Sequence, residues 1–149
     1  MKSFKISLLV LLIVFVGIQF IPTKRNQSEN VPKTDFIIVN NAPKNIKNTF
    51  QTSCYDCHSN NTSYPWYNKV QPVAWLLENH IEEGKAELNF SEWDNYSDRR
   101  KKSKLKSIIS QIEDNEMPLS SYTIIHKNAN LSNQQKSEII DWISKLDMK

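Results

Sequence analysis

The sequence predicts an all-α domain of about four helices, preceded by an apolar N-terminal segment and a linker. Glycine occurs only at positions 17 and 84, which is too few for a sheet protein rich in hairpins. Apolar residues recur at helical spacing in four separate stretches. We place the apolar segment at residues 1–22, the linker at 23–41 and the domain at 42–149.

The apolar segment has the layout of an export signal. Residues 6–21 are almost entirely apolar, and Lys2 and Lys5 precede them. The run is short for a membrane span, but no small-x-small pair marks a cleavage site at its end, so we favour an uncleaved signal anchor over a cleaved signal peptide. We therefore expect a single-pass protein of the cell inner membrane with its domain in the periplasm. Cleavage would instead leave a secreted periplasmic protein.

The linker is polar and contains prolines. Its sequence from residue 22 is "PTKRNQSENVPKTD", followed by a short apolar patch at residues 36–39. This composition is typical of a tether that keeps a domain away from a membrane.

Four helices are expected in the domain, each with one apolar face. Pro43 suits the first turn of the first helix, and Gly84 suits the C-terminal cap of the second. Pro118 ends the third, at about residues 97–116, because a proline disfavours the helical conformation of the residue before it. Ser132 and Gln135 form a capping box at the start of the fourth. The four faces are Ile46, Phe50, Cys54 and Cys57; Val73, Leu76, Leu77, His80 and Ile81; Leu105, Ile108, Ile109 and Ile112; and Ile139, Trp142, Ile143 and Leu146.

Both cysteines of the chain stand next to a histidine. Cys54, Cys57 and His58 form C-x-x-C-H, the attachment sequence of c-type haem. Positions i and i+3 of a helix lie on one face, so two sulfurs can reach one edge of a porphyrin while the next residue turns its imidazole onto the iron. We expect the other ring nitrogen of His58 to be hydrogen-bonded to a backbone carbonyl.

The same three residues have three other interpretations. A disulfide between Cys54 and Cys57 suits an exported protein, but it closes a very small loop and leaves His58 without a role. A zinc site lacks a second pair of ligands in the sequence. A thioredoxin-like redox pair would need a βαβ setting, which this helical pattern does not offer.

The second axial ligand of the iron is the harder question. Met117 is the best candidate, because a thioether in a loop after the third helix, held extended by Pro118, can lie over a haem carried by the first. His80 on the second helix is the rival, although a lone histidine on an apolar face is often a core residue. We expect His126 to pack near the haem edge or to bond a propionate.

Two further patterns have both an ordinary and a functional interpretation. Six aromatic residues are enough to line a porphyrin pocket, but they could equally form an ordinary hydrophobic core. They are Tyr64, Trp66, Tyr67, Trp75, Phe90 and Trp93. The basic run "RRKKSKLK" at residues 99–106 reads as a solvated helix face. It could instead steer an acidic redox partner or lie against anionic lipid.

The ordered motifs resemble the bacterial haem-binding domain proteins of cytochrome c type. The resemblance covers about residues 41–146 and is carried by "CYDCHSNNTSYPWY", "VQPVAWLLENHIEEGKAELNFSEW", "NEMPLSSYTIIHKNANLS" and "IIDWI". It implies a small cytochrome c-like helical domain with one covalent haem c. In this chain it implies attachment at Cys54 and Cys57, His58 as axial ligand and Met117 as the second.

These observations together predict an electron carrier rather than an enzyme. No acid–base constellation indicates catalysis, and a redox partner protein, unidentified by the sequence, is implied. The formal net charge of +3, part of it in the two N-terminal lysines, makes nucleic acid an unsuitable partner. One alternative is a haem-based enzyme or a gas or redox sensor with an open distal position. Another is an interaction module with a disulfide and no haem.

Overall fold

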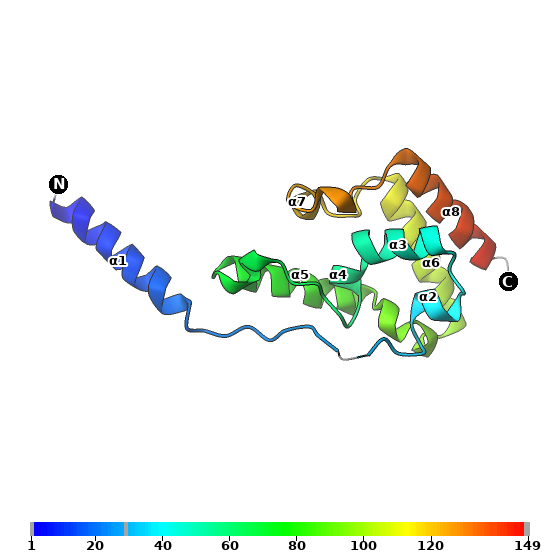
Figure 1. The fold of residues 1–149 in the computed structure, drawn as a ribbon, viewed down its shortest axis with the longest axis horizontal. Helices are drawn as coiled ribbons and strands as arrows, with labels where there is room; N and C mark the ends of the chain where they lie inside the picture. Colours follow the sequence, from blue (N-terminus) through cyan, green and yellow to red (C-terminus); the bar gives the residue numbers. More distant parts are fainter. Residues whose placement is uncertain (1, 29, 148–149) are drawn as a thin grey trace.

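The computed structural model describes residues 2–28 and 30–147, and the regular structure in them is helical (Figure 1). No strand occurs in this part of the chain, although one antiparallel bridge joins Gln27 to Asn61. The predicted all-α class is thus confirmed. The elements are α1 (Lys2–Ile18), α2 (Phe36–Val39), α3 (Lys44–Ser53), α4 (Tyr55–His58), η1 (Trp66–Lys69), α5 (Val73–Glu87), η2 (Phe90–Asn95), α6 (Asp98–Glu113), α7 (Ser120–Thr123), η3 (Lys127–Ala129) and α8 (Asn133–Asp147), where η denotes a 3₁₀ helix.

Helix α1 stands apart from the other helices and has no buried residue (Figure 1). Of the helices in the described residues, none combines the length and the apolar character that crossing a membrane requires. The chain just after α1 is nevertheless tied to the domain. The side chain of Gln19 donates to the carbonyl of Gln71 (3.2 Å) and accepts from its backbone N–H (2.9 Å).

The second half of the expected linker belongs to the domain. Phe36 is fully buried and Ile37 nearly so, and both lie in the main hydrophobic cluster. Asp35 begins the one-turn helix α2 by accepting a hydrogen bond from the N–H of Ile37 (2.9 Å). The domain therefore starts earlier than residue 42, because the apolar patch at residues 36–39 supplies part of the core. The patch is short, and the polar composition of the surrounding linker obscures it in the sequence.

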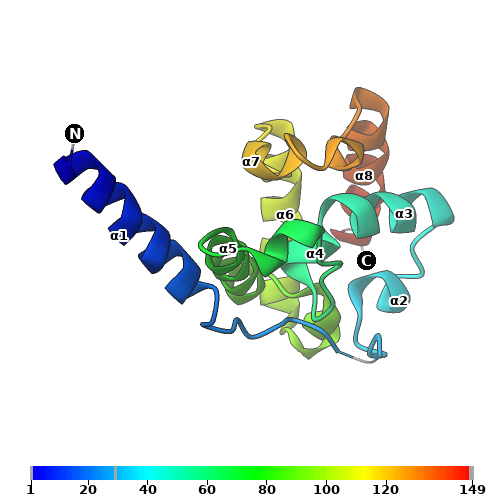
Figure 2. The same cartoon turned by 60° about the vertical axis from the view of Figure 1, so that its left-hand side comes forward.

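The core is an aromatic cluster between α2, α3, η2 and α8. The ring of Phe36 lies 5.3 Å from that of Phe50 and 4.7 Å from that of Trp93, measured between centroids. Phe90 packs edge-on against Phe50 at 5.4 Å. Helix α6 packs on α8, and α4 lies between α3 and α5 (Figure 2). Such aromatic contacts fix the relative positions of α3, which ends directly before the cysteines described below, and η2, whose Phe90 packs near them.

Two of the four predicted helix faces agree with the structure, and the first agrees only as far as Phe50, because its helix ends at Ser53, before both cysteines. Helix α3 buries Ile46 and Phe50, α6 buries three residues and α8 buries two: Leu105, Ile108, Ile112, Ile139 and Ile143. The predicted capping box is also present. The N–H of Ser132 donates to the Oε1 of Gln135 (2.9 Å), and the N–H of Gln135 donates to the Oγ of Ser132 (3.2 Å).

Helix α5 differs from the expected second helix in its face and in its end. Val73 and Leu76 are 42% and 57% exposed, whereas Ala74 and Ile81 are buried. The helix continues through Gly84 to Glu87, so Gly84 is not a cap. A Cβ at Gly84 would lie 2.8 Å from the carbonyl oxygen of Cys57, and the glycine is needed for the close approach of α5 to α4.

Helix α6 ends earlier than Pro118 alone would require. Its last residue is Glu113, and Asn115 has a φ of 58°, in the left-handed region. The N–H of Glu116 bonds the carbonyl of Gln111 (2.9 Å), and the N–H of Asn115 bonds that of Ile112 (3.3 Å). These two bonds form a Schellman motif, which turns the chain before the proline is reached.

Candidate functional site

The C-x-x-C-H sequence forms a compact turn between two helices. Helix α3 ends at Ser53, and Cys54 leaves helical geometry with φ −129° and ψ −39°. The N–H groups of Cys57 (3.3 Å) and His58 (3.0 Å) both donate to the carbonyl of Cys54, so α4 is one tight turn. Both thiols and the imidazole are thereby held within a few residues of fixed backbone.

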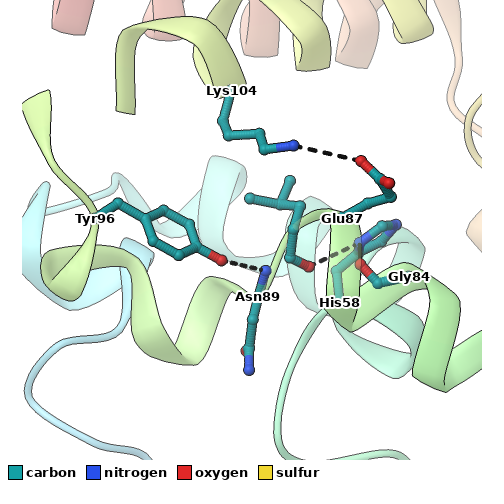
Figure 3. Close-up of polar contacts among 7 residues, drawn as sticks. His58, Gly84, Glu87, Asn89, Tyr96 and Lys104 are labelled. Atoms are coloured by element: carbon teal, nitrogen blue, oxygen red, sulfur yellow. Dashed lines mark hydrogen bonds and ion pairs between the residues drawn. The ribbon is translucent and has the colours of Figure 1, made fainter. Parts of the chain in front are cut away.

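The imidazole of His58 is oriented by two backbone carbonyls. Its Nδ1 lies 2.9 Å from the carbonyl oxygen of Gly84 and 3.0 Å from that of Leu88 (Figure 3). Because carbonyls only accept, Nδ1 carries the hydrogen, and Nε2 keeps a lone pair for a ligand. Burial lowers the pKa of His58 from its ordinary value, although the two carbonyls oppose this shift. The expectation of a carbonyl partner for the other ring nitrogen is confirmed.

Two adjoining cavities meet at this turn. Their volumes are about 270 and 350 Å³, and the residues that line both are Ser53, Cys54, His58, Glu87, Met117 and Pro118. The first extends along α6 past Lys104 and Gln111. The second extends past Cys57, His80 and Tyr122. The structure therefore brings all five predicted site residues to this pair of cavities, called the hollow below. They are Cys54, Cys57, His58, His80 and Met117.

Met117 and His80 reach that hollow from different elements. Met117 follows the Schellman turn, where its N–H bonds the carbonyl of Gln111 (3.1 Å), and it lines both cavities, as His58 does. His80 lines only the second cavity and lies on α5, the helix whose Gly84 carbonyl holds His58. An axial pair needs its two donors on opposite sides of one plane. Met117, on an element that does not hold His58, is better placed for this, and the choice between the two ligands stays a prediction.

The other predicted cofactor-facing side chains lie mostly elsewhere. His126 lines neither cavity: its Nε2 is 2.7 Å from the hydroxyl of Tyr67, and its ring stacks on Tyr122 at 4.3 Å. Of the six aromatic residues, only Phe90 lines a cavity, where its ring centroid is 6.0 Å from that of His58. Trp66 is 79% exposed, and Trp93 belongs to the core.

Both cysteines are free thiols in the structure. Loss of hydration raises the pKa of Cys54 to about 12 and that of Cys57 to about 11, so both are protonated at neutral pH. In the described part of the chain no group of three or more histidine, cysteine or carboxylate side chains is placed to hold a metal ion. The zinc interpretation thus finds no ligand set there.

Sequence reasoning missed the groups that hold the site in place. The carbonyls of Gly84 and Leu88 have no side-chain signature, and only the rarity of glycine pointed to position 84. Asp56, between the two cysteines, accepts a 2.6 Å hydrogen bond from the hydroxyl of Tyr122, which no local pattern predicts. Lys104 lines the first cavity, but nothing in the sequence distinguishes it from the other lysines of the basic run at residues 99–106.

The donors around the hollow suit a haem. An imidazole nitrogen with a free lone pair, a thioether and two thiols line cavities whose walls are mainly apolar. The comparisons with known proteins agree. The family model of the haem-binding domain matches residues 13–145, while no curated protein and no solved structure matches the chain. Because the matched residues make up most of its length, the chain belongs to the haem-binding domain family.

Proposed function

We propose that the protein is a monohaem c-type cytochrome that carries electrons. Cys54 and Cys57 bind the haem covalently, His58 is its proximal ligand and Met117 its distal ligand. The observation that carries the proposal is the fixed tautomer of His58. Two carbonyls accept the hydrogen of Nδ1, so Nε2 keeps its lone pair for the iron. His58 lies beside both thiols, which line the same cavity.

The thiols supply the covalent link. Cys54 and Cys57 would each hold the haem through a thioether bond, formed when the S–H adds across a carbon–carbon double bond of the group. No atom is lost in this addition. The reaction needs the two cysteines reduced, which is the state in which the structure holds them.

The chain's part in electron transfer is to keep two axial donors at fixed positions. When bound, haem supplies an iron that gains or loses one electron. His58 cannot rotate without breaking its bonds to Gly84 and Leu88, and the Met117 loop is joined to α4 through the hydrogen bond from Tyr122 to Asp56. A preset pair of donors favours fast transfer to a docked redox protein over binding and turnover of a substrate, and the proposal is therefore a carrier and not an enzyme.

The proposed location is the outer face of the cell inner membrane, with α1 as the N-terminal anchor. Two features support it: most side chains of α1 from Ile6 onward are apolar and exposed, and Lys2 and Lys5 precede this apolar run. Fractionation of cells expressing the full chain tests the anchor. Recovery of the protein in the membrane fraction with an intact N-terminus supports it, and a soluble shortened chain contradicts it.

The distal ligand is tested by two matched substitutions, Met117→Ala and His80→Ala, in the haem-loaded protein. We expect the sulfur-to-iron charge-transfer band in the red to disappear in M117A and to persist in H80A. The reverse result would assign the ligand to His80. Absence of the band in the unsubstituted protein, together with strong carbon monoxide binding by its ferrous form, would instead favour a haem enzyme or sensor with an open distal position.

A further inference from the structure

The first cavity is lined by a lysine, Lys104, whose ion pair in the structure is weak. Lys104 lies on α6, and its Nζ is 3.5 Å from the Oε2 of Glu87 (Figure 3). A good charge-assisted hydrogen bond between an ammonium and a carboxylate is about 2.7–2.9 Å long. The Glu87 side chain is 82% exposed and can return to water, whereas the Lys104 side chain is only 22% exposed. The ammonium is thus held beside the cavity by one long ion pair with an exposed carboxylate.

The charges around the two cavities are uneven. Of the described residues that line either one, Lys104 is the one lysine or arginine, and it lines the first cavity. Glu83 lines the second, and Glu87 lines both. An anionic group would therefore be repelled in the second cavity and would find a cation in the first.

The thiols set the direction of the haem. Haem carries two propionate carboxylates on the edge opposite its vinyl groups, and the vinyl groups must face the cysteines. Cys54 lines both cavities and Cys57 lines only the second, so a haem attached to both thiols would have its opposite edge directed toward the first. Ser107 and Gln111 follow Lys104 at helical spacing and line the same cavity, which extends the polar stripe on α6.

We propose that Lys104 anchors a haem propionate through a charge-assisted hydrogen bond, exchanging Glu87 for the carboxylate when haem binds. The proposal rests on the proposed function, because it takes the orientation of the haem from Cys54 and Cys57. It assigns a role to one lysine of the basic run at residues 99–106, for which the sequence predicts a solvated face, with partner steering or lipid contact as alternatives.

Two ligands that differ only in their carboxylates test this assignment. The full chain without haem, with its thiols reduced and in detergent, is titrated with haemin and with haemin dimethyl ester, and binding is followed by the absorbance of the bound ligand. We expect Lys104→Gln to weaken haemin binding roughly three- to tenfold and to leave binding of the ester unchanged. Lys104→Arg should keep most of the affinity for haemin.

Lys101→Gln is the matched control. Lys101 lies one turn earlier on α6 with the same 22% exposure, but its Nζ pairs with Asp94 at 2.7 Å and it lines neither cavity. It should change neither affinity. An equal loss for haemin and ester in K104Q would give Lys104 a purely structural role, and no loss for haemin would remove it from the site; either result overturns the proposal. If the unsubstituted chain binds neither ligand, the proposed function itself fails.

Discussion

Gly84 serves the site twice, through its carbonyl and through its missing side chain. The carbonyl orients His58, and the absence of a Cβ lets α5 approach the carbonyl of Cys57. The two effects are linked, because a shift of α5 away from α4 would also move the carbonyl away from the imidazole.

We expect Gly84→Ala to destabilise the domain by roughly 1–3 kcal/mol, the usual cost of forcing extra volume into a packed contact. The free energy of unfolding, measured with denaturant, checks this. Gly17→Ala is the control, because a Cβ there meets nothing within 4 Å. Equal stability of the two variants would show that the close approach at Gly84 is unimportant.

Asp35 is a buried carboxyl whose bonds are incomplete. Its Oδ1 accepts from the hydroxyl of Tyr55 (2.9 Å) and from the N–H of Ile37, while its Oδ2 has no hydrogen-bond partner. Burial raises the pKa of Asp35 above its ordinary value, although both bonds oppose the shift. A carboxyl whose pKa is higher in the folded state takes up protons on folding, so acid favours the folded state between the two pKa values.

The free energy of unfolding of the wild type, minus that of Asp35→Asn, should therefore increase as the pH falls from 7 through the raised pKa. The slope is at most about 1.4 kcal/mol per pH unit for one proton, and other titrating groups cancel in the difference. Denaturant unfolding at several pH values measures it. A difference that increases with rising pH would contradict the raised pKa.

At the scale of the element, the segment from the end of α6 to η3 carries Met117. It leaves α6 through the Schellman motif at Asn115 and is fastened at its other end by two hydrogen bonds, from Tyr122 to Asp56 and between Tyr67 and His126. Ile124 and Ile125 are 71% and 61% exposed, so little apolar burial holds the segment down. We infer that the hydrogen bond at Tyr122 contributes to keeping Met117 over the cavity.

Tyr122→Phe should raise the affinity of the ferric haem-loaded protein for added imidazole by roughly three- to tenfold, because the loop yields its position more easily without the 2.6 Å bond. Spectral titration with imidazole measures this. Tyr64→Phe is the control: it removes the hydrogen bonds of the Tyr64 hydroxyl with Glu78 (3.0 Å) and with the N–H of Asn26 (2.6 Å), but Tyr64 lines neither cavity. An unchanged affinity in Y122F would exclude this positioning role.

The elements that the sequence predicts well are those whose information is local. Helices α3, α6 and α8 have strong apolar periodicity and recognisable ends, and the turn with C-x-x-C-H has a specific spacing. The face of α5 is predicted poorly. Its apolar residues are spread around the helix, and its buried side is decided by the distant contact of Gly84 with Cys57. The sequence also does not predict which backbone carbonyls orient His58 or that Tyr122 bonds Asp56, because these contacts join residues that only the tertiary fold brings together.

At the scale of the whole molecule, the boundary of the domain is the largest difference between expectation and structure. Phe36 is fully buried among Phe50, Phe90 and Trp93, although it lies in a stretch whose composition indicates a tether. The polar part before it also contacts the domain: the N–H of Asn26 donates to the hydroxyl of Tyr64 (2.6 Å). Single aromatic residues in polar segments can thus belong to a core.

Two truncations test this boundary. A chain that starts at residue 19 should fold with nearly full stability, because α1 has no buried residue and the hydrogen bonds of Gln19 to Gln71 are kept. A chain that starts at residue 42 should be destabilised by at least about 3–5 kcal/mol, the cost of losing one buried phenylalanine side chain. Thermal unfolding followed by circular dichroism compares them. If the two truncated chains were equally stable, residues 34–41 would belong to the linker and not to the domain.

The central claim, covalent haem at Cys54 and Cys57, is tested most directly by the intact mass of the protein matured in cells that have haem-attachment machinery. The account predicts the mass of the polypeptide plus one whole haem, retained under denaturing conditions, and the mass of the bare polypeptide for the Cys54→Ala, Cys57→Ala double variant. A wild-type protein with the bare mass, or a double variant that retains the haem mass, would contradict it.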